Sequence, residues 1–295
     1  ETTIVALLII TTILWAFSFS LIGEYLAGSV DSYFSVLMRV GLAALVFLPF
    51  LRTRGQSPRT IVLYMLVGAM QLGIMYLLAF RAYLYLTVSE FLLFTVFTPL
   101  YITLIYDLLS GRKLRWGYLL SAALAVLGAA IIRYDKVSDH FWTGLLLVQL
   151  SNICFAIGMV GYKRLMEVRP MPQHNAFAWF YAGAFIVAVA AWFMLGNPQR
   201  LPTTGLQWGI LVWLGVVASG LGYFMWNYGA TQVDAGTLGI MNNVHVPAGL
   251  LVNLAIWQEQ PHWPSFIIGA LVILASLWVH RRWVAPHSVQ TADDR

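Results

Sequence analysis

Amide, hydroxyl and imidazole side chains occur inside apolar stretches of this chain, where an unpaired polar group would be costly. In hydrocarbon such groups are stable only when they face a protein interior or a water-filled cavity. Together they can hold a small neutral or zwitterionic molecule by hydrogen bonds, and neighbouring aromatic rings can stack on it. We expect a binding site of this kind from Trp15, Ser18, Gln71, Asn152, Tyr223, Asn227, Asn242, Asn243 and His245.

Catalytic chemistry is not indicated by the motifs of the chain. The sequence contains no H-E-x-x-H, no G-x-S-x-G and no paired-aspartate motif, and His245 has no nearby acid in the sequence that would orient it. An enzyme that acts inside the membrane is therefore kept only as an alternative from a different class. The sequence predicts no metal site and no cofactor.

The composition places these residues in a membrane protein. Hydrophobic residues make up 60% of the 295 residues and charged residues 10%, and the mean hydropathy is +0.77, which a soluble domain could not cover with polar surface. About 20 apolar residues cross a bilayer as a helix. Ten apolar segments come close to this length: 3–23, 32–51, 60–80, 88–108, 116–133, 142–162, 175–195, 206–228, 236–257 and 264–283.

The Lys and Arg residues predict the orientation of these segments. Loops 51–59, 110–115 and 163–169 and the C-terminal tail hold most of the positive charge, as cytoplasmic loops do. Both termini are therefore expected in the cytoplasm. The net charge of +5 is interpreted as a topology signal, which argues against a nucleic-acid partner.

The chain also contains an internal repeat. Pro99 and Pro247 lie 148 residues apart in similar surroundings. Five helices per half is an odd number, so the second half must enter the membrane from the opposite side, and equivalent loops should differ in charge. The loop SGRKLRW is strongly basic, whereas its counterpart QEQPHWP has no Lys or Arg. We therefore predict an all-α integral membrane protein with ten transmembrane helices in two inverted five-helix repeats, residues 1–135 and 136–295; chance similarity between two hydrophobic halves is the alternative.

The two prolines predict hinges. A proline inside a helix removes one backbone hydrogen bond and frees a carbonyl four residues earlier. Pro99 would free the carbonyl of Thr95, and Pro247 that of Asn243, at equivalent depth in both halves. Their alternative role is simple close packing beside nearby glycines.

Charged residues are expected mainly near the membrane surfaces. Arg39 is a plausible partner for Glu24 or Glu90, and we predict an outer-side charge pair between Arg39 and Glu90. Only His245 is a titratable group expected at the centre, and its alternative role is a neutral ring satisfied by a neighbouring backbone group. Transport would then be facilitated diffusion without obligatory proton coupling.

The chain resembles the EamA-type drug/metabolite transporter superfamily over nearly its whole length. The resemblance is carried by the runs TVFTPLYITLIYDLLSGRKLRWGYLLSAALAVLGA and NNVHVPAGLLVNLAIWQEQPHWPSFIIGALVILAS and by Arg39. Glu259 resembles an acidic residue of the family, whereas the first half has Gly111 there. Small residues resemble the glycine pairs of the family, with one member replaced in each half: Ser121 with Gly128, and Gly269 with Ser276.

Within this superfamily the chain looks most similar to the YddG-type aromatic amino-acid exporters. The resemblance implies an inner-membrane exporter of aromatic and other neutral amino acids, working by alternating access. Its partners would be these amino acids and the lipid bilayer, and a monomer is consistent with the sequence. The alternative is a proton-coupled exporter of drugs or other small amphipathic metabolites.

Overall fold

The computed structural model describes residues 2–109, 116–132, 139–233, 242, 245–258 and 263–283, and their regular structure is helical throughout. The helices up to residue 132 are α1 (Thr2–Leu21), α2 (Ser32–Phe47), α3 (Pro58–Gly68), α4 (Met75–Ala82), α5 (Val88–Phe94), α6 (Thr98–Leu109) and α7 (Trp116–Ile132). The remaining described helices are α8 (Asp139–Val168), α9 (Gln173–Leu195), α10 (Gly205–Trp213), α11 (Gly222–Ala230), α13 (His245–Trp257) and α14 (Trp263–Trp283).

Short turns of other helical types connect several of these helices without a loop. The π-helical turns are η1 (Ile22–Leu26), η3 (Ala69–Ile74) and η5 (Leu214–Leu221), and the 3-10 turns are η2 (Leu48–Phe50) and η4 (Thr95–Phe97). Through η3 and η5, α3 continues into α4 and α10 into α11. Turns of the π type inside helices often occur at functional sites.

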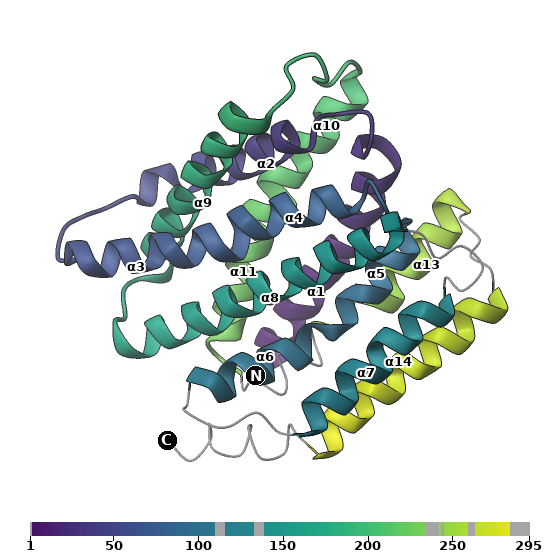
Figure 1. Ribbon diagram of the computed structural model, residues 1–295. Helices are drawn as coiled ribbons and strands as arrows, with labels where there is room; N and C mark the ends of the chain where they lie inside the picture. Colours follow the sequence, from purple (N-terminus) through teal and green to yellow (C-terminus); the bar gives the residue numbers. More distant parts are fainter. Residues whose placement is uncertain are drawn as a thin grey trace.

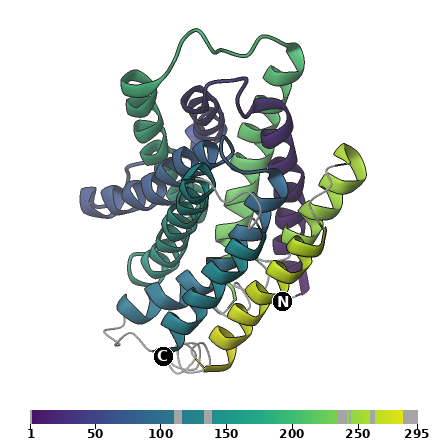
Figure 2. The same ribbon diagram turned by 45° about the vertical axis from the view of Figure 1, so that its right-hand side comes forward.

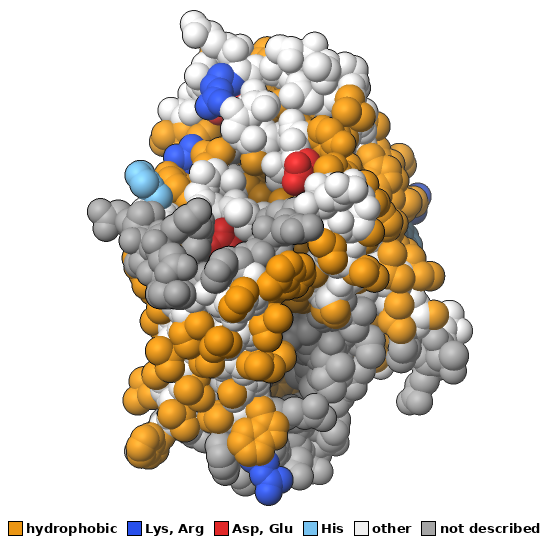
Figure 3. All heavy atoms as spheres, turned by 90° about the vertical axis from the view of Figure 1, so that its right-hand side faces the viewer, with side chains coloured by type: hydrophobic (Ala, Val, Ile, Leu, Met, Phe, Trp, Pro, Cys, Tyr) orange, Lys and Arg blue, Asp and Glu red, His pale blue; other side chains and the backbone are white. Residues whose placement is uncertain are grey.

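Seven helical stretches in the described part of the chain are long and apolar enough to cross a membrane. They match seven of the ten predicted apolar segments. The other three predicted segments contain shorter apolar helices, at Leu119–Ile131, His245–Trp257 and Trp263–Ser276. Hydrophobic side chains cover much of the described surface on the side shown in Figure 3, as expected for a protein that faces lipid.

The two halves of the chain are interleaved in one bundle. Helix α9 packs on α2 and α3, α8 packs on α4 and α6, and α1 lies between α11 and α13 (Figure 1). Helices α7 and α14 pack side by side at the edge of the bundle (Figures 1 and 2). The centre is therefore built from helices of both halves.

The small residues singled out in the sequence meet between α7 and α14. The Ser276 hydroxyl donates to the Ser121 carbonyl at 2.5 Å. A Cβ atom added to Gly128 would lie 2.9 Å from the Gly269 carbonyl oxygen, so the two helices approach closely at this point.

Hydrogen bonds between neighbouring segments show which of the described loops lie at the same end of the bundle. At one end the backbone N–H of Asp31 donates to the Arg200 carbonyl at 2.8 Å. At the other end Trp179 Nε1 donates to the Arg52 carbonyl at 3.1 Å, and Arg169 Nη1 donates to Thr60 Oγ1 at 3.0 Å. The second end carries the basic stretches 51–59 and 163–169; the latter was expected to be a loop, whereas all but its last residue belongs to α8.

Pro99 lies within the continuous helical stretch Val88–Leu109, directly after the 3-10 turn η4, and Pro247 lies in α13; their role as hinges stays a prediction. Pro99 is the second residue of α6 and Pro247 is the third of α13. Proline is tolerated there because the first N–H groups of a helix have no intrahelical partner. Just before Pro99 the helix tightens into the 3-10 turn η4, where the Thr95 carbonyl accepts the Thr98 N–H and, at 2.8 Å, the Thr98 hydroxyl.

Candidate substrate-binding site

A cavity lies at the centre of the bundle, between helices of both halves. Its volume is about 80 Å³, which is smaller than the roughly 300–1,000 Å³ usual for small-molecule sites, so the described state holds the cavity nearly closed. Its walls come from α1, α2, α4, α5, α8, α11 and α13 and from the 3-10 turn η4. The lining residues include Trp15, Phe19, Arg39, Tyr76, Phe91, Thr95, Asn152, Phe155, Tyr223, Asn242 and His245.

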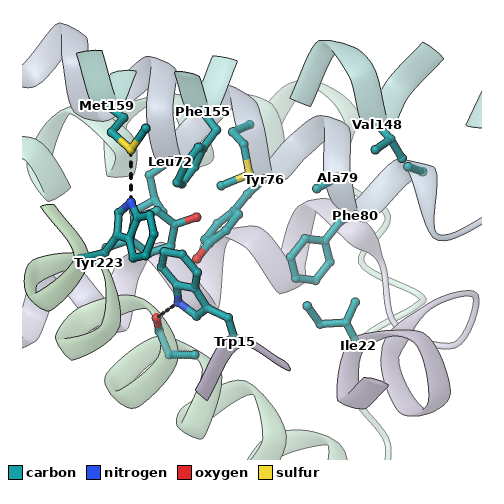
Figure 4. Close-up of a cluster of buried hydrophobic side chains, with 14 of the residues drawn as sticks. Trp15, Ile22, Leu72, Tyr76, Ala79, Phe80, Val148, Phe155, Met159 and Tyr223 are labelled. Carbon is teal, nitrogen blue, oxygen red and sulfur yellow. Dashed lines mark hydrogen bonds between the residues drawn. The ribbon is translucent and has the colours of Figure 1, made fainter. Parts of the chain in front are cut away.

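Aromatic side chains form one wall of the cavity (Figure 4). The Trp15 ring lies 4.8 Å from that of Tyr223 and 6.2 Å from that of Phe155, measured between centroids. Trp15 Nε1 donates to the Ala218 carbonyl in η5 at 2.9 Å, which holds the indole in place. This wall offers flat apolar surface to a ligand, with its polar N–H already satisfied.

The polar groups of the cavity lie at the 3-10 turn η4 and at the first described residues of α13. The Thr95 hydroxyl lies 2.9 Å from His245 Nε2, and His245 Nδ1 bonds the Asn242 carbonyl. Asn152 Nδ2 donates to the Phe94 carbonyl at 3.0 Å.

Arg39 also lines the cavity, on α2. Its side chain is 4% exposed, its Nε donates to the Ser219 hydroxyl, and its Cζ lies 4.1 Å above the Tyr76 ring. A guanidinium over an aromatic face is attracted by the ring quadrupole. The cavity thus combines an aromatic wall, a polar region and one buried positive charge.

The structure does not bring Arg39 and Glu90 together as the predicted charge pair. Arg39 contacts Ser219 and Tyr76, whereas Glu90 Oε1 accepts from the Thr87 N–H at 2.9 Å in a capping box at the start of α5. The helix start captures the carboxylate because its first N–H groups need acceptors.

Five of the predicted site residues line the cavity: Trp15, Asn152, Tyr223, Asn242 and His245. The structure places three others outside its lining. The Ser18 hydroxyl donates to the Leu14 carbonyl at 3.0 Å within α1. Gln71 and Asn227 exchange two amide hydrogen bonds, at 3.1 and 3.0 Å, so each satisfies the other in the core. Asn243 lies outside the described residues.

Sequence reasoning did not assign Arg39, Tyr76 and Thr95 to the site. A signal for Thr95 was present, since it lies four residues before Pro99. Arg39 was singled out by the family resemblance and Tyr76 by no pattern, and the place of both in the cavity depends on how α2 packs on α4 and η5.

The fold and the cavity define a multi-helix membrane protein that can hold a small solute between its two halves. The chain belongs to the EamA-like transporter family, which matches residues 2–134 and 142–281. It is therefore a membrane transporter and not an enzyme. A solved structure described only as "Crystal structure of protein" has a TM-score of 0.63 and 18% identity, covers 95% of this chain and 97% of its own, and supports the fold alone.

Several curated relatives match almost the whole chain. The protein named "Biotin transporter" in Escherichia coli (strain K12) is 84% identical over 290 residues, which are 98% of this chain and 97% of that protein. A "Biotin transporter" from Salmonella typhimurium is 83% identical over the same shares. A "Probable biotin transporter" from Pseudomonas aeruginosa is 56% identical over 93% of this chain and 96% of its own length.

These relatives overturn the prediction of an aromatic amino-acid exporter, which is wrong, and the YddG-type subtype has no support among them. The alternative of a transporter for other small amphipathic metabolites fits better. From the sequence, Arg39 was expected in an outer-side charge pair, whereas the structure places it in the lining of the cavity. The resemblance identified the fold family correctly, and the substrate depends on side chains within that fold.

Proposed function

We propose that this chain transports biotin across the bacterial inner membrane through the central cavity. The observation that carries this proposal is the 83–84% identity, over 98% of the chain, to relatives named for biotin transport. At such identity a substrate cavity is expected to keep its shape and its polar groups.

The chemistry of the cavity agrees with biotin. Biotin has a cyclic urea with two N–H donors and one carbonyl, fused to a sulfur-containing ring, and a side chain that ends in a carboxylate. The amide oxygen of Asn152 and the hydroxyl oxygen of Thr95 can accept from the urea N–H groups, whereas both nitrogens of His245 are already bonded, to Thr95 and to the Asn242 carbonyl. Trp15 and Tyr223 supply apolar surface for the fused rings. The paired amides of Gln71 and Asn227, together with Ser18, would support the surrounding helices.

The decisive experiment is counterflow of labelled biotin in proteoliposomes. Vesicles with the purified protein, preloaded with unlabelled biotin, should accumulate labelled biotin transiently, and protein-free vesicles should not. Phenylalanine offered in excess should leave this signal unchanged. If the protein is folded and labelled biotin does not enter, the proposed substrate is wrong.

The ten apolar segments are proposed to form two inverted five-helix repeats, residues 1–135 and 136–295. The π-helical turns η3 and η5 support this, because they occupy similar places in the two halves, as Pro99 and Pro247 do. Rocking of one half against the other about these helix starts would expose the cavity to each side in turn. A monomer contains the whole cavity.

Both termini are proposed to lie in the cytoplasm. The end that carries residues 51–59 and 163–169 is basic, which supports a cytoplasmic location for it. In a Cys154→Ala background, an impermeant maleimide added to intact cells should label a cysteine at exposed Gln199 and spare one at exposed Thr53. The reverse pattern, or equal labelling, would contradict this orientation.

A further inference from the structure

Most of the hydrogen-bonding capacity of Arg39 is unused by the described residues. A guanidinium has five N–H donors. Only the Nε donor has a partner, the Ser219 hydroxyl, and among the described residues the two terminal nitrogens have neither a hydrogen-bond acceptor nor a carboxylate. Arg39 is only 4% exposed, and it lines the cavity.

The neighbours of Arg39 hold it in a defined orientation. Ser219, which accepts from Nε, lies 2.7 Å from the Tyr76 hydroxyl. The Tyr181 hydroxyl donates to the Ser219 carbonyl at 2.6 Å, which fixes this part of η5. The Tyr76 ring covers one face of the guanidinium. Arg39 is thus held at its Nε and on one face of the guanidinium. The edge that carries the two terminal nitrogens is available for a ligand.

A buried positive charge without a counter-ion is unfavourable. The desolvation of an ion is costly, and a cation–π contact offsets only part of it. The free edge of a guanidinium matches a carboxylate, which it binds through two parallel hydrogen bonds. An anionic substrate would provide both the missing charge and the missing acceptors.

We propose that Arg39 is the carboxylate-binding residue of the cavity, so that the transporter selects amphipathic acids with a single negative charge. This rests on the proposed function, in which the acid is biotin. Its carboxylate binds at Arg39, between α2, α4 and η5, and its cyclic urea lies toward Thr95, Asn152 and His245. Arg39 is then a specificity-determining residue.

The first test uses the wild-type protein, so no variant needs to fold. Labelled-biotin counterflow is measured with increasing biotin or biotinamide, in which a neutral carboxamide of nearly the same size replaces the carboxylate. Biotinamide should compete about 10- to 100-fold more weakly, the loss expected when a charge-assisted hydrogen bond disappears. Equal competition by the two compounds would overturn the assignment of Arg39.

The second test asks whether the preference resides in Arg39. The Arg39→Gln variant should bind biotin and biotinamide equally, Arg39→Lys should keep part of the preference, and the exposed control Arg54→Gln should keep all of it. If Arg39 were only structural, both compounds would weaken together with an unchanged ratio, and the proposal would be wrong.

The outcomes separate the two proposals. No counterflow of labelled biotin by folded wild-type protein overturns the proposed function. If labelled biotin shows counterflow and biotinamide competes as well as biotin does, the carboxylate subsite is overturned. The proposal of biotin transport then stands.

Discussion

Replacing Gly68 or Gly183 by alanine is expected to remove most of the correctly folded protein. A Cβ atom at Gly68 would lie 1.9 Å from the Phe180 carbonyl oxygen, and one at Gly183 would lie 2.0 Å from the Met65 carbonyl oxygen. The obstacles are backbone atoms on the facing helix, so no side chain can turn aside. Each alanine must therefore push α3 and α9 apart.

Overpacking of this kind costs about 1–3 kcal/mol, and we expect the upper part of that range. With about 2–4 °C per kcal/mol, the melting temperature in detergent should fall by about 5–10 °C, and the monodisperse fraction in size-exclusion chromatography should shrink. Gly209→Ala is the matched control, because nothing lies within 4 Å of its added Cβ. Wild-type melting of Gly68→Ala would show that α3 and α9 do not cross as closely as described.

The membrane class and the helical fold could be predicted because both follow from the apolar environment of the lipid bilayer. Apolar runs of about 20 residues are helical in a bilayer, since the backbone must bond internally. The seven apolar stretches follow directly from this rule. The irregular helix turn near Pro99 was also accessible, because proline constrains its own neighbourhood whatever surrounds it.

The partners of individual polar residues could not be predicted in the same way. Gln71 and Asn227 carry the same sequence signal as Asn152, yet they pair with each other across 156 positions while Asn152 lines the cavity. Which amides pair depends on the relative rotation of α11 and the η3 segment. Helical spacing places a residue on a face, but it does not say what that face meets.

Arg39 illustrates the same limit for charges. The sequence placed it near the outer surface and offered Glu90 as the nearest opposite charge. The capping box at the start of α5 engages that carboxylate, and the packing of α2 on η5 turns Arg39 toward the cavity. Local backbone chemistry and helix packing therefore decide the roles of both residues.

The contact between Thr95 and His245 joins the two halves beside the cavity, and its loss should strongly slow the proposed transport of biotin. The Asn242 carbonyl can only accept, so His245 Nδ1 carries the proton of the neutral ring, and Nε2 accepts from the Thr95 hydroxyl. The same hydroxyl lies 2.6 Å from the Leu92 carbonyl within its own helix. The Leu92 carbonyl can only accept, so the single proton of the Thr95 hydroxyl is shared between Leu92 and Nε2, and it can stay on Leu92 when the halves separate.

Thr95→Val keeps the shape of the side chain and removes its hydroxyl, which leaves Nε2 of the buried imidazole without a donor. Such a loss costs about 1–3 kcal/mol, so counterflow of biotin should fall about 5- to 150-fold. Thr95→Ser should stay close to the wild type. Thr12→Val is the matched control, because Thr12 is buried in α1 outside the cavity lining and, among the described residues, its hydroxyl bonds only the Ile9 carbonyl.

In a double-mutant cycle with His245→Leu, the two losses should be far from additive, since both remove one contact. Additive losses, or normal transport by well-expressed Thr95→Val, would mean that this contact does not couple the two halves.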